Sequence, residues 1–227
     1  DNALVRAAGV IQRLADYRPP AKFHELWRQQ VGILDVDEET KSIMLDADRI
    51  DDWLDAHPVE GVARHFYSCT HTTFSPNLAE SDRQMKTNVI PDQIDINVDI
   101  RTLPGESTVE VQAHLDDALG DLANQVEVEI IMNDPASVSQ MDNPLWDTIQ
   151  KAVNQPFPSA RLSPQFIVGF TDARVYRNLG SVAYGAGLFS PDLKSSDFMT
   201  RFHGHNERID VESLRLTTQV WLDGGQE

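Results

Sequence analysis

The sequence predicts an α+β fold of the ferredoxin-like type for residues 1–134, followed by the C-terminal part of a larger α/β domain. Residues 94–101 alternate strictly between isoleucine or valine and polar side chains, as a half-buried strand does. Residues 1–134 read as helix, insertion, strand, strand, helix and strand, which becomes the βαββαβ order of a split βαβ fold once a missing first strand is added before Asp1. Residues 135–227 alternate helices with short apolar runs, which is typical of an α/β domain.

The first helix is predicted to run to about Tyr17. Asp1 and Asn2 can cap it, apolar residues recur at helical spacing, and Pro19 and Pro20 prevent its continuation. The chain begins with aspartate instead of methionine and passes directly into this patterned helix. We therefore expect the sequence to be a piece of a longer protein.

Residues 20–60 read as short helices inserted into this framework. Between Asp35 and Glu60 the sequence has ten acidic and two basic residues, a local net charge of −8. A solvated face is the simplest interpretation of such a run, and an acidic binding surface is the alternative.

The remaining elements of the first part follow from turn and cap signals. The aromatic and β-branched run 66–74 predicts a strand that ends at residues 75–77. After the alternating strand, residues 103–107 form a turn, and Ser107 or Thr108 can cap a helix over about 108–124, with Glu110 in its first turn. Residues 126–131 then predict another strand.

The last ninety residues contain the α/β elements. A helix starts at Asn143 and Pro144, and residues 166–168 predict a short buried strand that ends at Gly169. Thr171 or Asp172 can cap the next helix, residues 181–185 form another short strand, and the final helix starts near Ile209.

Composition excludes several classes of function. The formal net charge of −17 argues against nucleic acid, because binding to a phosphate backbone needs clustered lysine and arginine. No apolar run is long enough to span a membrane. Cys69 is the single cysteine, which rules out an internal disulfide and suits a cytoplasmic location. It has no activating surroundings in the sequence and reads as a core residue.

Three clusters could carry chemistry. Thr171, Asp172 and Arg174 stand at a helix start that could hold a polar group or a carboxylate, or they could be a cap and a surface arginine. Asn88 and Arg101 lie before and within the alternating strand, where Arg101 could equally form a cross-strand ion pair. His203 and His205 precede the final helix, and histidines so placed can bind a metal or simply lie on the surface.

Two other patterns are rejected. Residues 185–187 (Gly-Ala-Gly) lack the third glycine and the lysine of a phosphate-binding loop. The sequence also has no GxSxG motif, so a nucleophile-elbow hydrolase has no support.

The order of these motifs resembles a known family. Residues 88–91 (Asn-Val-Ile-Pro), 99–105 with Arg101, 171–174 and 203–208 follow one another as in the zinc-dependent metallopeptidases. That family contains aminoacylase-1, carboxypeptidase G, succinyl-diaminopimelate desuccinylase, acetylornithine deacetylase and carnosinase-type dipeptidases. The match spans nearly the whole chain apart from the 20–60 insertion, and residues 1–8 also look like the first lid helix of these enzymes.

The resemblance implies a domain division and roles for single residues. Residues 1–134 would be a lid that also makes a homodimer, and 135–227 the C-terminal segment of the catalytic domain. His203 matches the last zinc ligand. The residues that match substrate-binding positions are Asn88, Arg101, Thr171, Asp172 and Arg174. His205 stands where many members have proline, so we treat it as a residue that faces the substrate or supports the site, not as a ligand.

The implied chemistry is hydrolysis of the amide bond in dipeptides or N-acyl amino acids by a two-zinc centre. In such enzymes the general-base glutamate and the other zinc ligands lie N-terminal to the lid. We therefore expect these 227 residues alone to be inactive and to bind zinc weakly or not at all. The alternatives are a non-catalytic dimerisation or binding module with the lid fold, and an unrelated α+β structural protein.

Overall fold

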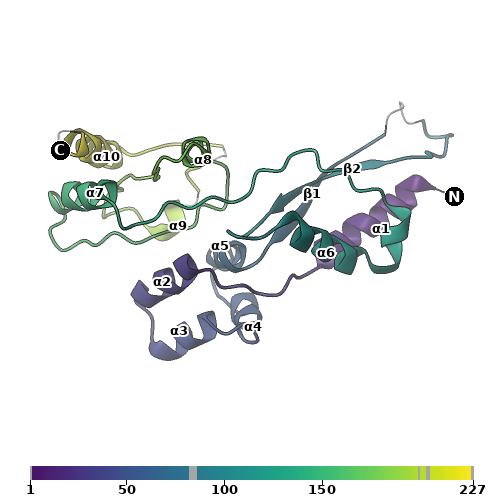
Figure 1. Cartoon of the computed structure of the whole chain (residues 1–227), viewed down its shortest axis with the longest axis horizontal. Coiled ribbons are helices and arrows are strands. Elements are labelled where there is room, and N and C mark those ends of the chain that lie inside the picture. The colour runs from purple at the N-terminus through teal and green to yellow at the C-terminus, as the bar shows by residue number, and fades with distance from the viewer. Residues whose placement is uncertain (1, 82–85, 199, 203–204, 226–227) are drawn as a thin grey trace. The chain divides into compact units, whose positions relative to one another are not determined.

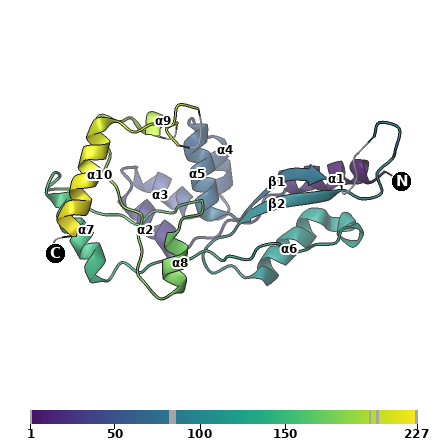
Figure 2. The ribbon, with the colours of Figure 1, turned by 90° about the horizontal axis from the view of Figure 1, so that it is seen from above.

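The computed structural model describes residues 2–81, 86–198, 200–202 and 205–225, without the side chains of residues 195 and 196. It divides into two compact units, Asp1–Ala136 with Phe166–Gly169, and Ser137–Gln165 with Phe170–Glu227 (Figures 1 and 2). Within the described ranges, every helix is too short or too polar to cross a membrane.

The first unit combines helices with a two-stranded sheet. Its elements in chain order are α1 (Ala3–Asp16), α2 (Glu25–Ile33), α3 (Glu38–Met44), α4 (Ile50–Asp55), α5 (Glu60–Thr70), β1 (Thr73–Glu80), β2 (Asp95–Arg101), α6 (Thr108–Leu119) and the 3₁₀ helix η1 (Gly120–Gln125).

The predicted alternating strand is confirmed as β2. It pairs antiparallel with β1, and the pairing ends at Thr73 opposite Arg101. The register shifts between Pro76 and Leu78, which places a bulge next to a proline in β1. Proline cannot donate to a ladder and is found at edges and bulges. The prediction that residues 75–77 end this strand is therefore wrong, because the bulge lets β1 continue past Pro76.

Helices α1 and α6 pack on the apolar face of this sheet (Figure 1). Val10 and Leu14 of α1 and Leu115 and Leu119 of α6 are buried in one cluster, against which the isoleucines and the valine of β2 pack. The predicted caps are confirmed: the Asn2 side chain accepts from Leu4 N–H, and Ser107 forms a full capping box with Glu110. The polar side chains of β2 thus lie on the face away from the two helices.

The short helices predicted within 20–60 are confirmed as α2, α3 and α4, and they form a second core with α5. Trp27 is fully buried and donates from Nε1 to the carbonyl oxygen of Met44 at 2.9 Å. The predicted strand over 66–74 is wrong, since α5 runs to Thr70. Ala63, Phe66 and Tyr67 recur at helical spacing and face this core, and the Phe66 ring lies edge-on to Trp27. Packing on Trp27 outweighs the β propensity of the run.

The strand predicted at residues 126–131 is not formed. These residues have no strand assignment, and Ile130 and Ile131 are exposed. Of the ferredoxin-like βαββαβ order, the described ranges therefore contain one antiparallel pair and the helices α1 and α6.

The elements described in the second unit are the helices α7 (Pro144–Asn154), α8 (Ala173–Asn178), α9 (Ser195–Phe198) and α10 (Val211–Gly224), joined by long irregular segments. Its core forms where Ile149 and Val153 of α7 meet Val220 of α10. The Asn143 cap agrees with the predicted helix start, and α10 begins after its cap residue Asp210, close to the start predicted near Ile209. The predicted strands at 166–168 and 181–185 are not formed. Phe166 is buried, but it packs in the Trp27 core of the first unit.

The core beneath the sheet gives a stability prediction. We expect Leu115→Ala to lower the free energy of unfolding by about 2–5 kcal/mol, because it leaves a cavity between α1, α6 and the sheet. Val109→Ala in the same helix removes an exposed side chain and should change stability by less than about 0.5 kcal/mol. Urea titrations followed by circular dichroism measure both, and equal effects of the two substitutions would contradict the assigned core.

Candidate functional site

Arg101 is the last residue of β2 and lies on the polar face of the sheet. Its Nε and Nη2 atoms both lie 2.8 Å from Oδ2 of Asp99, two residues back on the same face. The guanidinium is partly exposed. An ion pair of Arg101 with an aspartate of β2 is thus present, and the pair with Asp99 runs along one strand.

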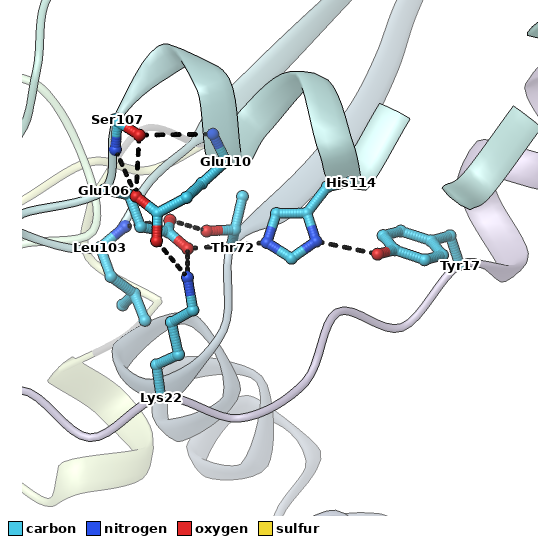
Figure 3. A network of polar contacts seen from close by, with 8 residues as sticks. All are labelled: Tyr17, Lys22, Thr72, Leu103, Glu106, Ser107, Glu110 and His114. Carbon is cyan, nitrogen blue, oxygen red and sulfur yellow. Dashed lines mark hydrogen bonds and ion pairs between the residues drawn. The ribbon is translucent and has the colours of Figure 1, made fainter. Parts of the chain in front are cut away.

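A polar network surrounds residues 103–110, the segment that follows Arg101 in the sequence (Figure 3). Its centre is the carboxylate of Glu106, whose side chain is only 4% exposed. Glu106 Oε1 accepts from Lys22 Nζ at 2.8 Å, and Oε2 accepts from the Leu103 backbone N–H at 3.1 Å and from the Thr72 hydroxyl. A buried carboxylate with these partners is well satisfied.

The charges in this network stabilise one another. Burial acts to raise the pKa of Glu106, but the bonds from Lys22, Thr72 and the Leu103 amide outweigh it and hold that pKa below its ordinary value. The bond to Glu106 raises the pKa of Lys22. The capping bonds from Ser107 lower the pKa of Glu110 to about 2, and Lys22 Nζ lies 3.1 Å from this carboxylate.

His114 extends the network toward α1. Its Nε2 lies 3.7 Å from Glu106 Oε1, and its Nδ1 lies 2.8 Å from the Tyr17 hydroxyl (Figure 3). Both ring contacts are made inside the unit, where His114 is buried. No sequence motif singles out Glu106, Lys22 or His114. The turn at 103–107 was the only local signal, and it marks the backbone but not the partners.

His71 forms a second buried polar contact, at the junction of α5 and β1. Its ring stacks on Tyr67 with centroids 4.0 Å apart, and its Nε2 lies 3.0 Å from Oδ1 of Asp51 in α4. Burial lowers the pKa of His71 although Asp51 opposes this effect. The two atoms are within ion-pair distance but do not have hydrogen-bond geometry, so this contact links α4 to the residue after α5 only weakly.

Asn88 and Arg101 do not meet within the unit. Asn88 is exposed in the connection between the strands, and Pro91 of the same connection accepts from Ala3 N–H at the start of α1. Arg101 lies at the opposite end of β2, about 20 Å of strand away. Any joint action of the two side chains on one small group would therefore need a second copy of this unit.

Thr171, Asp172 and Arg174 are together at the start of α8. Asp172 is the N-cap residue, but its side chain makes no capping bond. Arg174 lies 4.9 Å from the ring centroid of Phe170, and Thr171 and Asp172 are exposed. These contacts agree with a helix start whose arginine packs against a neighbouring ring.

His203, the predicted zinc ligand, lies outside the described residues. His205 is exposed. The two ends of this loop are joined, because Arg201 Nη1 lies 2.7 Å from Oδ2 of Asp210, the residue that caps α10. The cap bonds to Ser213 lower the pKa of Asp210 to about 2.

A zinc site is not formed by the described residues alone. Outside the gaps in the description, no group of three or more histidine, cysteine, aspartate or glutamate side chains is arranged to hold a metal. A dinuclear zinc centre needs several such ligands, so the described part does not fit the metal without further donors.

The comparison with known proteins settles the family. Residues 21–223 match the description "Peptidase family M20/M25/M40". This chain belongs to that peptidase family. The match covers most of the chain and includes Arg101, the α8 segment and the histidine loop, so the resemblance inferred from the motifs is confirmed.

Several curated members of the family are similar to this chain. It is 31% identical over 140 residues to the N-fatty-acyl-amino acid synthase/hydrolase PM20D1 of Xenopus tropicalis, covering 61% of this chain and 26% of that protein. It is 28% identical over 132 residues to the probable carboxypeptidase S-like 2 of Dictyostelium discoideum, covering 57% and 24%. The matched part therefore spans about a quarter of these relatives.

A solved family member has the same fold. The metallo-carboxypeptidase Sso-CP2 from Sulfolobus solfataricus matches with a TM-score of 0.57 and 17% identity, over 99% of this chain and 52% of that one. At this identity the match concerns the arrangement of the elements alone. This chain thus combines helices and strands as the Sulfolobus peptidase does.

Acid should weaken the Glu106 network. Because the pKa of Glu106 is lowered by folding, its stabilisation is complete above the ordinary carboxyl pKa and is lost as the pH falls through the lower pKa of the folded state. We expect Glu106→Gln to lower the free energy of unfolding by about 1–3 kcal/mol at pH 7 and by less at pH 3. Urea titrations at both pH values measure this difference. The exposed-residue control Glu127→Gln should follow the wild type, and an equal loss for Glu106→Gln at both pH values would contradict the assignment.

Proposed function

We propose that this chain provides the lid and the C-terminal part of the catalytic domain of a dizinc hydrolase of this family. The hydrolase cleaves the amide bond of dipeptides or N-acyl amino acids. In this proposal residues 1–134 form the lid, with the helical insertion at 20–60, and residues 135–227 return to the catalytic domain.

The observation that carries the proposal is the fixed position of Arg101. The guanidinium stands on the polar face at the end of β2, where Asp99 holds it through Nε and Nη2. A guanidinium in a fixed orientation is suited to a carboxylate because its donors match both oxygens. In a chain of net charge −17, a small anion is not drawn to the surface in general and needs such a local cation.

The relatives favour a substrate with a free carboxylate. The names of the similar proteins refer to carboxypeptidase and to N-fatty-acyl-amino acid chemistry. A peptide C-terminus and an N-acyl amino acid share one feature, an amide bond next to an amino acid whose carboxylate is free. We assign that carboxylate to Arg101. Asn88 of a second copy contributes an amide to the same substrate or to the oxyanion, and Thr171, Asp172, Arg174 and His205 line the pocket.

We propose that the lid has the ferredoxin-like fold in the complete protein. Residues 126–131 have the alternating composition of a strand, yet Val128, Ile130 and Ile131 are exposed. A further strand between β2 and these residues would pair with both and would cover them. The lid also makes a homodimer in this proposal, and the protein is placed in the cytoplasm, where its single cysteine stays reduced.

His203 is proposed as one zinc ligand, with the remaining ligands and the general base supplied from outside these 227 residues. Zinc would lower the pKa of a bound water and polarise the scissile carbonyl. This chain's own part is to hold the substrate: Arg101 fixes the carboxylate, and Asn88 donates its amide hydrogens.

Arg101 provides the decisive test in the complete protein that contains this chain. We expect Arg101→Ala to raise KM for an N-acyl amino acid by about 100-fold and to leave kcat nearly unchanged, because carboxylate binding is lost equally from the ground state and the transition state. The variant should also lose the preference for the free acid over its carboxamide. The control is Arg28→Ala, which removes an exposed arginine of α2. It should keep the wild-type KM and the preference for the free acid. A preference that survives Arg101→Ala would overturn the assignment.

Metal content tests the zinc proposal. We expect the 227-residue chain, dialysed after exposure to zinc, to retain far less than one ion per chain by mass spectrometry, since one histidine cannot hold a dinuclear centre against water. The complete protein should retain two, and His203→Ala there should release at least one. Two tightly bound zinc ions in the isolated chain would contradict the proposal that the other zinc ligands lie outside these 227 residues. A complete protein without zinc or hydrolase activity would instead favour a non-catalytic dimerisation or binding module.

A further inference from the structure

The turn that follows Arg101 is built to take one conformation. Gly105 has a φ of +90°, and the Glu106 N–H donates to the carbonyl oxygen of Leu103 at 3.1 Å. Proline in the second position and glycine with positive φ in the third are the requirements of a type II turn, and Pro104 and Gly105 meet them. Leu103 is buried. The chain therefore reverses two residues after Arg101, and the Glu106 side chain points back toward the end of the sheet.

Beyond the last backbone pair of the sheet, the Glu106 carboxylate connects the two chain segments in place of a further pair of backbone hydrogen bonds. The backbone pairing ends at Thr73 opposite Arg101. Beyond this pair, Oε2 of Glu106 accepts from the hydroxyl of Thr72, one residue before Thr73, and from the N–H of Leu103, two residues after Arg101. One side chain thus joins both strands immediately outside the pair that contains Arg101.

Lys22 keeps this carboxylate charged inside the unit. Its Nζ contacts Oε1, the oxygen that the two strands do not use, at 2.8 Å. The Lys22 backbone N–H donates to the carbonyl oxygen of Thr70 at 2.8 Å. The segment that leads into α2 is therefore fixed at both its main chain and its side chain. An ionised carboxylate that is 96% buried would be unfavourable without such a cation.

We propose that Glu106 is a positioning residue for Arg101. Its carboxylate fixes the end of β2 and the turn after it, and so holds the guanidinium where the substrate carboxylate binds. Lys22 and Thr72 act through Glu106. This inference rests on the proposed function of Arg101. The effect of Glu106 on the order of the Arg101 side chain does not depend on that function and can be measured on the isolated chain.

The first experiment measures the order of the Arg101 side chain by ¹⁵N relaxation of its Nε–H group in the 227-residue chain. We expect an order parameter typical of a rigid group, about 0.85, in the wild type and below about 0.6 in Glu106→Gln. Thr72→Val removes a single donor with little change in shape and should give an intermediate value. Leu115→Ala, which destabilises the same unit from its apolar core, should leave the Arg101 signal rigid at a temperature where the chain is folded.

The second experiment is a double-substitution cycle in the complete protein. We expect Glu106→Gln to raise KM for an N-acyl amino acid by about 10-fold with kcat changed by less than about two-fold, because a displaced binding group weakens binding before it affects the chemical step. In the Arg101→Ala background the same substitution should not raise KM further. Independent effects would instead multiply. Glu106→Ala, which keeps no acceptor, should raise KM more than Glu106→Gln does.

The outcomes separate the two proposals. If Arg101→Ala leaves KM unchanged, the proposed function of Arg101 fails whatever the result for Glu106. If Arg101→Ala raises KM while Glu106→Gln changes neither KM nor the relaxation of Arg101, the positioning role fails and the function stands. An effect of Glu106→Gln on KM that multiplies with that of Arg101→Ala would show that Glu106 acts by a route other than Arg101, and would also overturn the inference.

Discussion

The first unit depends on one buried carboxylate. Glu106 binds groups from three separate segments: Lys22 before the helices α2 to α5, Thr72 after them, and Leu103 after the sheet. The chain enters and leaves the helical segment through Lys22 and Thr72, so both connections meet at the same group. Loss of any one partner would leave buried charge less well compensated, which couples the helical segment to the sheet energetically.

Elements with strong local signals were predictable from the sequence. The caps at Asn2, Ser107 and Asn143 and the alternation in β2 each depend on neighbouring residues only. The errors arose where distant residues decide the structure. Residues 66–70 have strand-forming side chains but turn helical because Trp27 packs on Phe66. Residues 126–131 have the composition of a strand, yet a strand also needs a neighbour to pair with, and composition cannot supply one.

The candidate site also combines local features, which the sequence predicts, with long-range contacts, which it does not. Arg101 and the turn after it could be predicted, since a charged residue on the polar face of a clear strand and a Pro-Gly pair are local features. The group that fixes them could not, because its partners are 84 and 34 residues from Glu106 in the sequence. Such contacts appear only when the chain is folded. The roles of Arg101, Asn88, the α8 segment, His203 and His205 stay predictions.

The bulge beside Pro76 makes the two edges of the small sheet different. β1 carries a proline, which has no N–H to offer a neighbour, and an irregular register at the same point. Both features are known to discourage the addition of a strand at an edge. β2 has neither. The sheet is thus asymmetric as a template: its β1 side resists indiscriminate association with other chains, and its β2 side remains able to accept a specific partner strand.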